Sequence, residues 1–146
     1  MSYDKLEKII NESFEKKEKV GPKSDKKLIK AINETINLVD GGKIRVANKR
    51  SGNWIVNQWI KKAILLSFRI NKMEMMKGPY TTWYDKVPGK TVKWKEKDWK
   101  KAGYRHVPNG VVRKGAFIAF TNLLSDFGPT FSFFSKLSFI IFSNLS

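Results

Sequence analysis

Residues 57–71, NQWIKKAILLSFRIN, carry the strongest helical pattern of the chain. The apolar and small side chains recur at intervals of three and four residues, which places them on one face of an α-helix. That face consists of Ile60, Ala63, Ile64, Ser67 and Phe68, widened by Trp59 and Leu66. A helix with so broad an apolar face needs partners that cover it. We therefore expect the hydrophobic core to be centred on this helix.

Two further amphipathic helices are expected before it. Residues 3–18 repeat apolar side chains with the same helical spacing, and a Gly-Pro pair ends the pattern. Ser24 is suited to cap a second helix, which runs to Asp40 and stops at a Gly-Gly pair. Because the connection between them is short, the two helices are expected to form an antiparallel hairpin.

The other segments predict short elements and loops. Residues 43–48 alternate between apolar and polar side chains, and the chain returns after a Ser-Gly turn, which predicts a β-hairpin. Residues 73–93 contain two Gly/Pro pairs and are expected to form a loop. Residues 94–102 predict a short helix that Gly103 stops, and residues 104–107 predict a strand.

Composition excludes several kinds of chemistry. The chain has 146 residues, a net charge of +16, no cysteine and one histidine. The absence of cysteine excludes disulfides, thiolate zinc sites and cysteine nucleophiles, and a single histidine excludes an ordinary histidine metal centre. Only five of the 29 basic residues are Arg, the residue preferred for bidentate recognition of phosphates and bases. Lys, Ile, Asn and Phe are abundant and have A/T-rich codons, which favours codon drift over a nucleic-acid-binding face.

A few side chains are candidates for binding. Trp residues among lysines could stack on bases, but Trp54 and Trp59 fall on elements expected to pack in the core, which is the better interpretation. Arg69 ends an apolar helix, where a cation suits the helix dipole. Arg105 lies between an aromatic residue and a proline, and its forked guanidinium could hold a carboxylate bidentately. His106 is expected to pack rather than to act as a base.

A six-residue step begins after residue 109. Val112, Ile118 and Leu124 are six residues apart, a spacing typical of a parallel β-helix built from hexapeptide repeats, which needs about three or more coils for stability. The pattern then dissolves into a tail that holds seven of the ten Phe residues. The chain therefore looks like the front of a longer protein. We expect three regions: an amino-terminal α+β domain at 1–109, the start of a β-helix at 110–119, and an aberrant Phe/Ser-rich tail at 120–146.

Neither end of the chain has the composition of a membrane or export signal. A transmembrane helix needs about 20 predominantly apolar residues, whereas the tail contains Pro129, Lys136 and several serines. The first ten residues are charged and have no apolar signal core. We therefore expect a cytoplasmic protein. A small basic nucleic-acid-binding protein and a tail-anchored membrane protein are the alternatives.

Four separated blocks of sequence resemble one protein family. They are WIVNQWIKKAILLSFRIN at 54–71, YDKVP at 84–88, GYRHVP at 103–108 and VRKGAFIA at 112–119. In this order they are similar to the amino-terminal domain of tetrahydrodipicolinate N-succinyltransferase, a bacterial transferase of lysine and diaminopimelate biosynthesis. The resemblance runs from about residue 6 to residue 119. It implies an α+β fold in which a helical hairpin, a β-hairpin and a Trp-rich helix lead into a left-handed parallel β-helix, here cut short.

The resemblance also implies an activity. The family transfers succinyl from succinyl-CoA, a co-substrate rather than a tightly bound cofactor, to the amino nitrogen of a small dicarboxylic acid. It works as a homotrimer, by direct attack of the amine on the thioester. Arg105 matches the arginine of the family's G-[FY]-R-x-V-P block and would hold a substrate carboxylate. No catalytic, cofactor-binding or metal-binding residue carries over, because the family's other contacts lie in the β-helix.

The tail departs from the family pattern. The family continues after GAFIA with further hexapeptide steps, whereas this chain continues with Phe and Ser. A frameshift near residue 120 in an A/T-rich gene would produce such a change. We therefore expect a truncated chain that is inactive alone, with neither nucleic acid nor membrane as a partner. The exposed Phe-rich tail predicts a monomer or an aggregating species.

Overall fold

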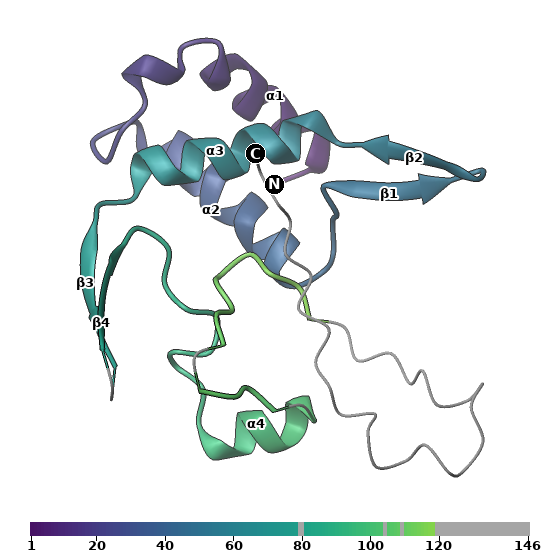
Figure 1. Cartoon of the computed structure of the whole chain (residues 1–146). Coiled ribbons are helices and arrows are strands. Elements are labelled where there is room, and N and C mark those ends of the chain that lie inside the picture. The colour runs from purple at the N-terminus through teal and green to yellow at the C-terminus, as the bar shows by residue number, and fades with distance from the viewer. Residues whose placement is uncertain (79–80, 104, 109, 119–146) are drawn as a thin grey trace. The chain divides into compact units, whose positions relative to one another are not determined.

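A computed structural model of the chain describes residues 1–78, 81–103, 105–108 and 110–118 (Figure 1). The chain divides into two compact units. The first, called here the helical unit, consists of Met1–Pro88 and Lys114–Phe117, and the second unit contains Gly89–Arg113. The expected domain boundaries at 109 and 119 stay a prediction, and residues 119–146, which include the predicted tail, lie outside the described residues.

The described residues form helices and two β-hairpins, so the expected α+β class is confirmed. The helices are α1 (Tyr3–Phe14), the 3-10 turn η1 (Lys17–Lys19), α2 (Lys26–Asp40), α3 (Gln58–Ile70) and α4 (Glu96–Ala102). The strands are β1 (Ala47–Arg50), β2 (Asn53–Val56), β3 (Glu74–Lys77) and β4 (Thr82–Asp85). None of the helices among the described residues is long and apolar enough to cross a membrane.

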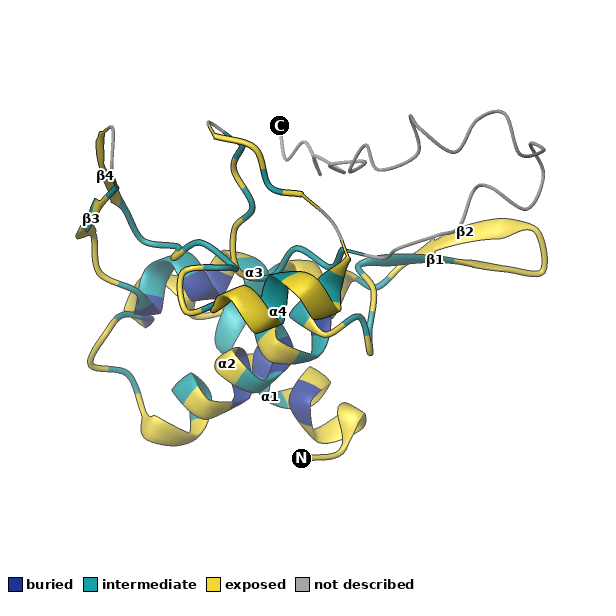
Figure 2. Cartoon of the chain, turned by 90° about the horizontal axis from the view of Figure 1, so that it is seen from below, coloured by how far each residue is buried: buried dark blue, intermediate teal, exposed yellow. Residues whose placement is uncertain are grey.

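Helices α1, α2 and α3 pack against one another and enclose the core of the helical unit (Figure 2). The buried residues of this cluster are Ile10, Val20, Ile32, Ala63, Leu66 and Ile70. Helix α3 thus lies at the core as expected, and Ile60, Ala63, Leu66 and Ser67 of the predicted face are buried. Ile64 and Phe68 of that face are only half-buried, and Ile70, which lies outside it, is buried as well.

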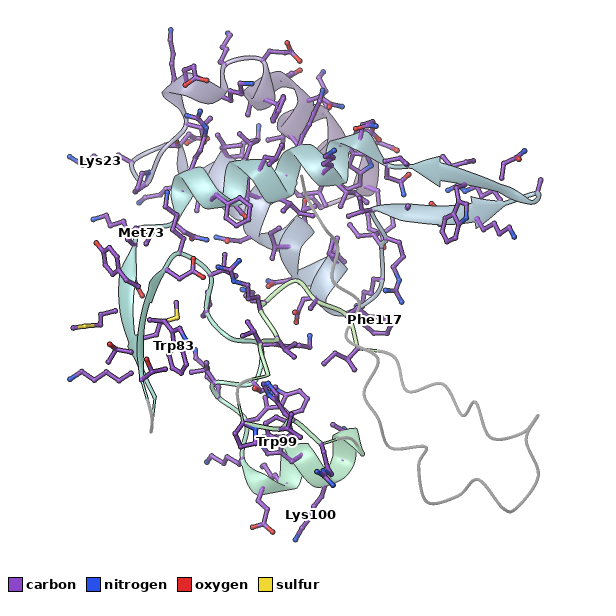
Figure 3. The ribbon with its side chains drawn as sticks, viewed as in Figure 1. Lys23, Met73, Trp83, Trp99, Lys100 and Phe117 are labelled. Atoms are coloured by element: carbon purple, nitrogen blue, oxygen red, sulfur yellow. The ribbon has the colours of Figure 1, made fainter. Side chains whose placement is uncertain are left out.

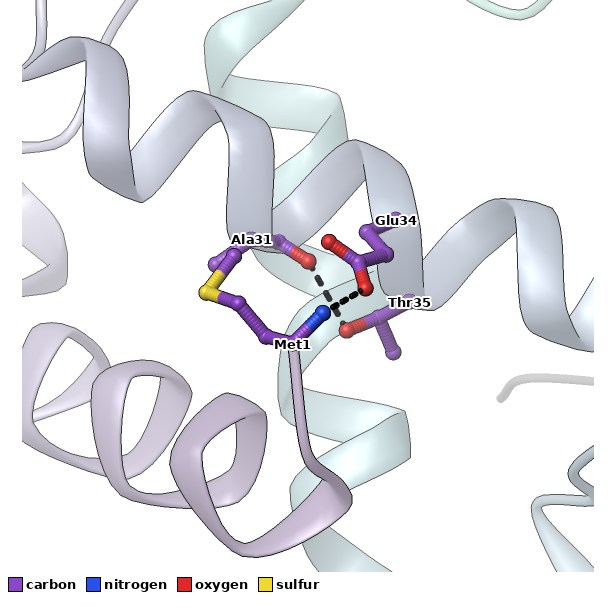
Figure 4. A network of polar contacts seen from close by, with 4 residues as sticks. All are labelled: Met1, Ala31, Glu34 and Thr35. Carbon is purple, nitrogen blue, oxygen red and sulfur yellow. Dashed lines mark hydrogen bonds and ion pairs between the residues drawn. The ribbon is translucent and has the colours of Figure 1, made fainter.

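One buried polar side chain lies within this core. Thr35 of α2 is fully buried, and its hydroxyl donates to the Ala31 carbonyl one turn earlier at 2.9 Å. The residue before it in α2 is Glu34, whose carboxylate forms an ion pair with the amino group of Met1 (Figure 4). The Thr35 hydroxyl is therefore satisfied within its own helix and needs no partner from the apolar core.

The helix boundaries differ in detail from the prediction. Helix α1 ends at Phe14 rather than at residue 18, and η1 replaces its last turn. Helix α2 is capped by Asp25, whose Oδ2 accepts from the Lys27 N–H at 3.2 Å. Ser24, the predicted cap, instead accepts from the Gly21 N–H at 2.9 Å. The aspartate therefore caps the helix, while the serine stabilises the preceding turn.

The two hairpins extend from the helices (Figure 1). The predicted hairpin is confirmed, but β1 begins at Ala47 rather than at residue 43, in register with Val56. The expectation of a loop over residues 73–93 is wrong, because β3 and β4 pair antiparallel there. Each sheet has only two strands, so each hairpin depends on its turn and its attachment to the helices for stability.

The second unit begins with a turn that leads into α4. Gly103 adopts the left-handed conformation at φ 69° and ends α4, as predicted. The expected strand at 104–107 is wrong over residues 105–107, which have no strand pairing. Gly89 forms an isolated antiparallel bridge with Arg113, and the Lys90 N–H donates to the Val112 carbonyl at 2.8 Å. The predicted β-helix reaches into residues outside the described ones and stays a prediction.

Candidate functional site

Arg105, the candidate substrate-binding residue, lies just after the end of α4. The N–H of Gly103 donates to the Trp99 carbonyl at 3.1 Å, and the left-handed backbone of Gly103 turns the chain away from the helix axis. Arg105 follows two residues later, and its side chain is exposed. The helix end therefore fixes where the segment that carries this arginine begins.

The next residue, His106, is held from two directions. Its Nε2 lies 2.9 Å from the Gly110 carbonyl oxygen, and its ring centroid lies 5.8 Å from that of Trp99, tilted by 43°. Trp99 in turn meets Trp94 nearly edge-on, with 4.9 Å between ring centroids. Figure 3 shows Trp99 and Lys100 projecting from opposite sides of α4. His106 therefore packs, as predicted, against the aromatic side of that helix.

A tight turn closes the segment after Arg105. The Gly110 N–H donates to the Val107 carbonyl at 3.0 Å. A Cβ atom on Gly110 would lie 2.8 Å from Cδ2 of His106 and 3.0 Å from the Val107 oxygen. A larger residue would therefore push the imidazole away, so the histidine ring and the glycine fit each other.

This arrangement can bind an anion but supplies no acid–base pair. The guanidinium of Arg105 is permanently charged, and its planar fork matches a carboxylate. His106 uses Nε2 for the Gly110 carbonyl, so that nitrogen is engaged in holding the turn. Among the described residues, no group of three or more His, Asp or Glu side chains lies close enough together to bind a metal ion.

Arg69, the other arginine considered, has a structural role in the helical unit. Its guanidinium lies 3.0 and 3.2 Å from the two carboxylate oxygens of Glu18 and so joins the end of α3 to η1. It lines an open groove of about 580 Å³ with an apolar floor that includes Leu65 and Phe68. Lys86 on the same groove donates to the Phe68 carbonyl at 3.0 Å. These charges are engaged within the fold, so the groove is not assigned as a site.

Trp54 and Trp59 were both expected to pack in the core, but only one of them does. Trp59 packs against the core cluster, as expected. Trp54 was expected in the core, but this is wrong, because its side chain is 71% exposed on β2. Among the described residues the sheet that carries Trp54 has two strands, and Lys49 lies opposite Trp54.

Sequence reasoning missed a set of contacts that holds residues 114–117 on the helical unit. The Gly115 N–H donates to Oδ1 of Asp40 at 2.7 Å. The guanidinium of Arg45 lies 4.1 Å from the centre of the ring of Phe117, which is labelled in Figure 3. A Cβ atom on Gly42 would lie 2.5 Å from the same ring. We call these five residues the latch. The Gly41-Gly42 pair signalled only a helix end in the sequence, and nothing in the pattern indicated its distant partner.

The family model of the amino-terminal domain of tetrahydrodipicolinate N-succinyltransferase matches residues 5–70. This match covers α1, α2, the first hairpin and α3. The model thus corresponds to most of the helical unit and ends where α3 ends.

Curated relatives extend the similarity beyond that domain. A protein of Pelagibacter ubique (strain HTCC1062) is 53% identical over 116 residues, which is 77% of this chain and 42% of the relative. A protein of Agrobacterium fabrum (strain C58) is 47% identical over 117 residues, 78% of this chain and 41% of the relative. One of Cereibacter sphaeroides (strain ATCC 17023) is 47% identical over 121 residues, 82% and 44% respectively.

All three relatives bear the name 2,3,4,5-tetrahydropyridine-2,6-dicarboxylate N-succinyltransferase. None of these names refers to nucleic acid, so the nucleic-acid alternative gains no support. The chain spans less than half the length of these relatives. The amino-terminal four-fifths of this chain therefore belongs to the tetrahydrodipicolinate N-succinyltransferase family and corresponds to the amino-terminal part of its members.

Proposed function

We propose that this chain is the amino-terminal part of an N-succinyltransferase that acts on a tetrahydropyridine dicarboxylate with succinyl-CoA as co-substrate. The observation that carries the proposal is the 53% identity over 116 residues to a relative of that name. At this level of identity the helical unit and the segment after it serve the same role as in the relative. In the whole protein that role belongs to lysine and diaminopimelate biosynthesis.

In this proposal Arg105 binds a carboxylate of the acceptor. The acceptor has two carboxylates by its name, and a bidentate arginine fixes both the position and the plane of one of them. The side chain of Arg105 is exposed. The segment on both sides is held by the end of α4 and the turn at Gly110, which supports a defined direction for the guanidinium.

The chemistry requires little from this chain beyond orientation. The amine lone pair attacks the thioester carbonyl, the new C–N bond forms, and the C–S bond breaks as the thiolate of CoA leaves. The proton lost by nitrogen neutralises the thiolate. Holding the acceptor in place converts an encounter of two substrates into a reaction within one complex, which accounts for a large part of such rate enhancements. Arg105 contributes this orientation and takes no proton.

Assembly and the binding of succinyl-CoA are assigned to the predicted β-helix. We therefore propose that the whole protein is a cytoplasmic homotrimer that holds no tightly bound cofactor. Residues 1–119 alone, without the surface for the second substrate, would not turn over succinyl-CoA. The latch supports this division, because it holds residues 114–117 against the helical unit at the start of the expected coils.

A graft tests the proposal. Residues 1–119 replace the corresponding amino-terminal part of the Pelagibacter ubique relative, and release of the CoA thiol is followed with a thiol-reactive dye. We expect acceptor-dependent release within about tenfold of the unmodified relative, a change of about 1.4 kcal/mol in the barrier. The natural relative is the positive control. A folded, soluble graft with no release above background would overturn the proposal.

A further inference from the structure

Arg105 and His106 are neighbours in sequence but differ in environment. Arg105 is exposed, whereas His106 is half-buried. His106 is also the only histidine of the chain. A residue placed directly beside a binding arginine can control the direction of that arginine through the shared backbone. The contacts of His106 therefore bear on what Arg105 can do.

The polar contact of His106 defines its tautomer. The Gly110 carbonyl oxygen can only accept a hydrogen bond, so Nε2 at 2.9 Å must carry the proton. This bond closes a loop of five residues, and the Gly110 N–H to Val107 bond at 3.0 Å closes a smaller turn inside it. The residue directly after Arg105 is thereby joined to Gly110.

The apolar contact of His106 joins the same loop to α4. The imidazole lies against Trp99, which is packed on Trp94, and the Trp99 carbonyl also accepts from Gly103. One residue of α4 thus contacts the chain on both sides of Arg105.

We propose that His106 is a positioning residue for Arg105. Its bond to Gly110 and its contact with Trp99 hold the backbone on the carboxyl side of Arg105. The guanidinium is presented in one direction as a result. The identity of the bound anion, a carboxylate of the acceptor, rests on the proposed function, but the restraint of the loop does not.

Three substitutions separate the two contacts. His106→Gln keeps a side-chain N–H that can reach the Gly110 carbonyl, and His106→Phe keeps a ring against Trp99 but loses the donor. His106→Ala loses both. Lys97→Ala, at an exposed position of α4, is the matched control in the same unit.

The first test uses the full 146-residue chain and measures backbone ¹⁵N relaxation. We expect the N–H order parameter of Arg105 to be about 0.85 in the wild type and in Lys97→Ala, and to fall below about 0.6 in His106→Ala. In His106→Gln the order parameter of Arg105 should stay close to the wild-type value. An order parameter of Arg105 that is equal in the wild type and His106→Ala would overturn the proposal.

The second measurement needs no variant. The chain has one imidazole, so its two ring nitrogens give one pair of ¹⁵N signals that report the tautomer directly. The Nε2–H form is expected. A dominant Nδ1–H form would contradict the Gly110 bond and with it the proposal, even if every substitution at residue 106 failed to fold.

The graft then connects the restraint to substrate binding. His106→Ala should raise the KM for the dicarboxylate by about tenfold, since misplacing a binding group by about 1 Å can reduce rates up to about a hundredfold. The KM for succinyl-CoA should not change, and His106→Gln should recover most of the affinity. Normal kinetics in His106→Ala beside an impaired Arg105→Ala would overturn the positioning role. An inactive wild-type graft would count against the proposed function, and the order parameter and tautomer would then decide the role of His106.

Discussion

The backbone N–H of Gly115 donates to Oδ1 of Asp40 at 2.7 Å, although 75 residues separate them. Asp40 is the last residue of α2, a position where a carboxylate is unfavourable for the helix dipole. The hydrogen bond offsets that disadvantage, and the Phe117 ring beneath Arg45 extends the same contact. The latch therefore anchors the segment that would enter the β-helix on the end of α2.

Removing the Asp40 carboxylate should destabilise the helical unit. Asp40→Ala is expected to lower the free energy of unfolding by about 1–2 kcal/mol, because a charge-assisted hydrogen bond is lost while the helix dipole is relieved. Asp40→Asn keeps an acceptor oxygen and should lower the free energy of unfolding by less. Urea denaturation followed by circular dichroism measures both, with the exposed Glu7→Ala on α1 as control. A midpoint for Asp40→Ala equal to that of Glu7→Ala would show that the latch contributes nothing to stability.

Gly42 and Gly52 allow backbone strain to be separated from steric conflict. Both have positive φ, 69° and 84°, but a Cβ on Gly42 would lie 2.5 Å from the Phe117 ring, whereas a Cβ on Gly52 would meet nothing within 4 Å. Gly52→Ala should therefore lower the free energy of unfolding by about 1–2 kcal/mol through backbone strain alone. Gly42→Ala should lose about 1–3 kcal/mol more from overpacking.

A double substitution decides the origin of that difference. In a Phe117→Ala background the additional loss at Gly42 should disappear, and Gly42→Ala should then resemble Gly52→Ala in its unfolding free energy. The cycle measures the coupling between the two sites directly. If the loss at Gly42 were the same with and without the Phe117 ring, the ring could not be packed against that glycine.

Adjacent leucines of α3 should differ sharply in their contribution. Leu66 is fully buried, and Leu65 is 38% exposed. Leu66→Ala should destabilise the chain by about 2–5 kcal/mol through lost burial and a cavity, the usual range for a buried leucine. Leu65→Ala should lower the free energy of unfolding by well under half of that amount. Thermal unfolding of both variants tests which face of α3 is buried, and similar losses would place the core on the wrong side of the helix.

The helices of the helical unit could be predicted because their apolar spacing extends over several turns. The edges of the buried face of α3 could not be predicted, since Leu66 and Ile64 are equally apolar and only the positions of α1 and α2 decide which of them is buried more deeply. The hairpin of β3 and β4 was missed because the Gly/Pro pairs within residues 73–93 indicate a loop. Met75 lies opposite Tyr84, and both side chains are exposed, so no buried face signals the pairing.

The site shows the same limit at shorter range. Arg105 was identified by its sequence neighbours and by resemblance to a family block, neither of which describes its surroundings in the fold. The restraint on His106 depends on Trp99, seven residues earlier in α4, and on a glycine four residues later. These positions come together only after the left-handed Gly103 has turned the chain. The sequence indicates the helix end at Gly103, but it does not indicate which later residues meet Trp99.

The central claim is that the segment after α4 presents Arg105 to a carboxylate of the acceptor. The most direct measurement compares the KM for the dicarboxylate in the active graft between Arg105→Ala and Arg50→Ala, an exposed arginine of β1. We expect Arg105→Ala to raise that KM by about tenfold to a hundredfold, as for loss of a charge-assisted contact of about 1.5–3 kcal/mol, and Arg50→Ala to leave it unchanged. Equal KM values for Arg105→Ala and the wild-type graft would contradict the claim.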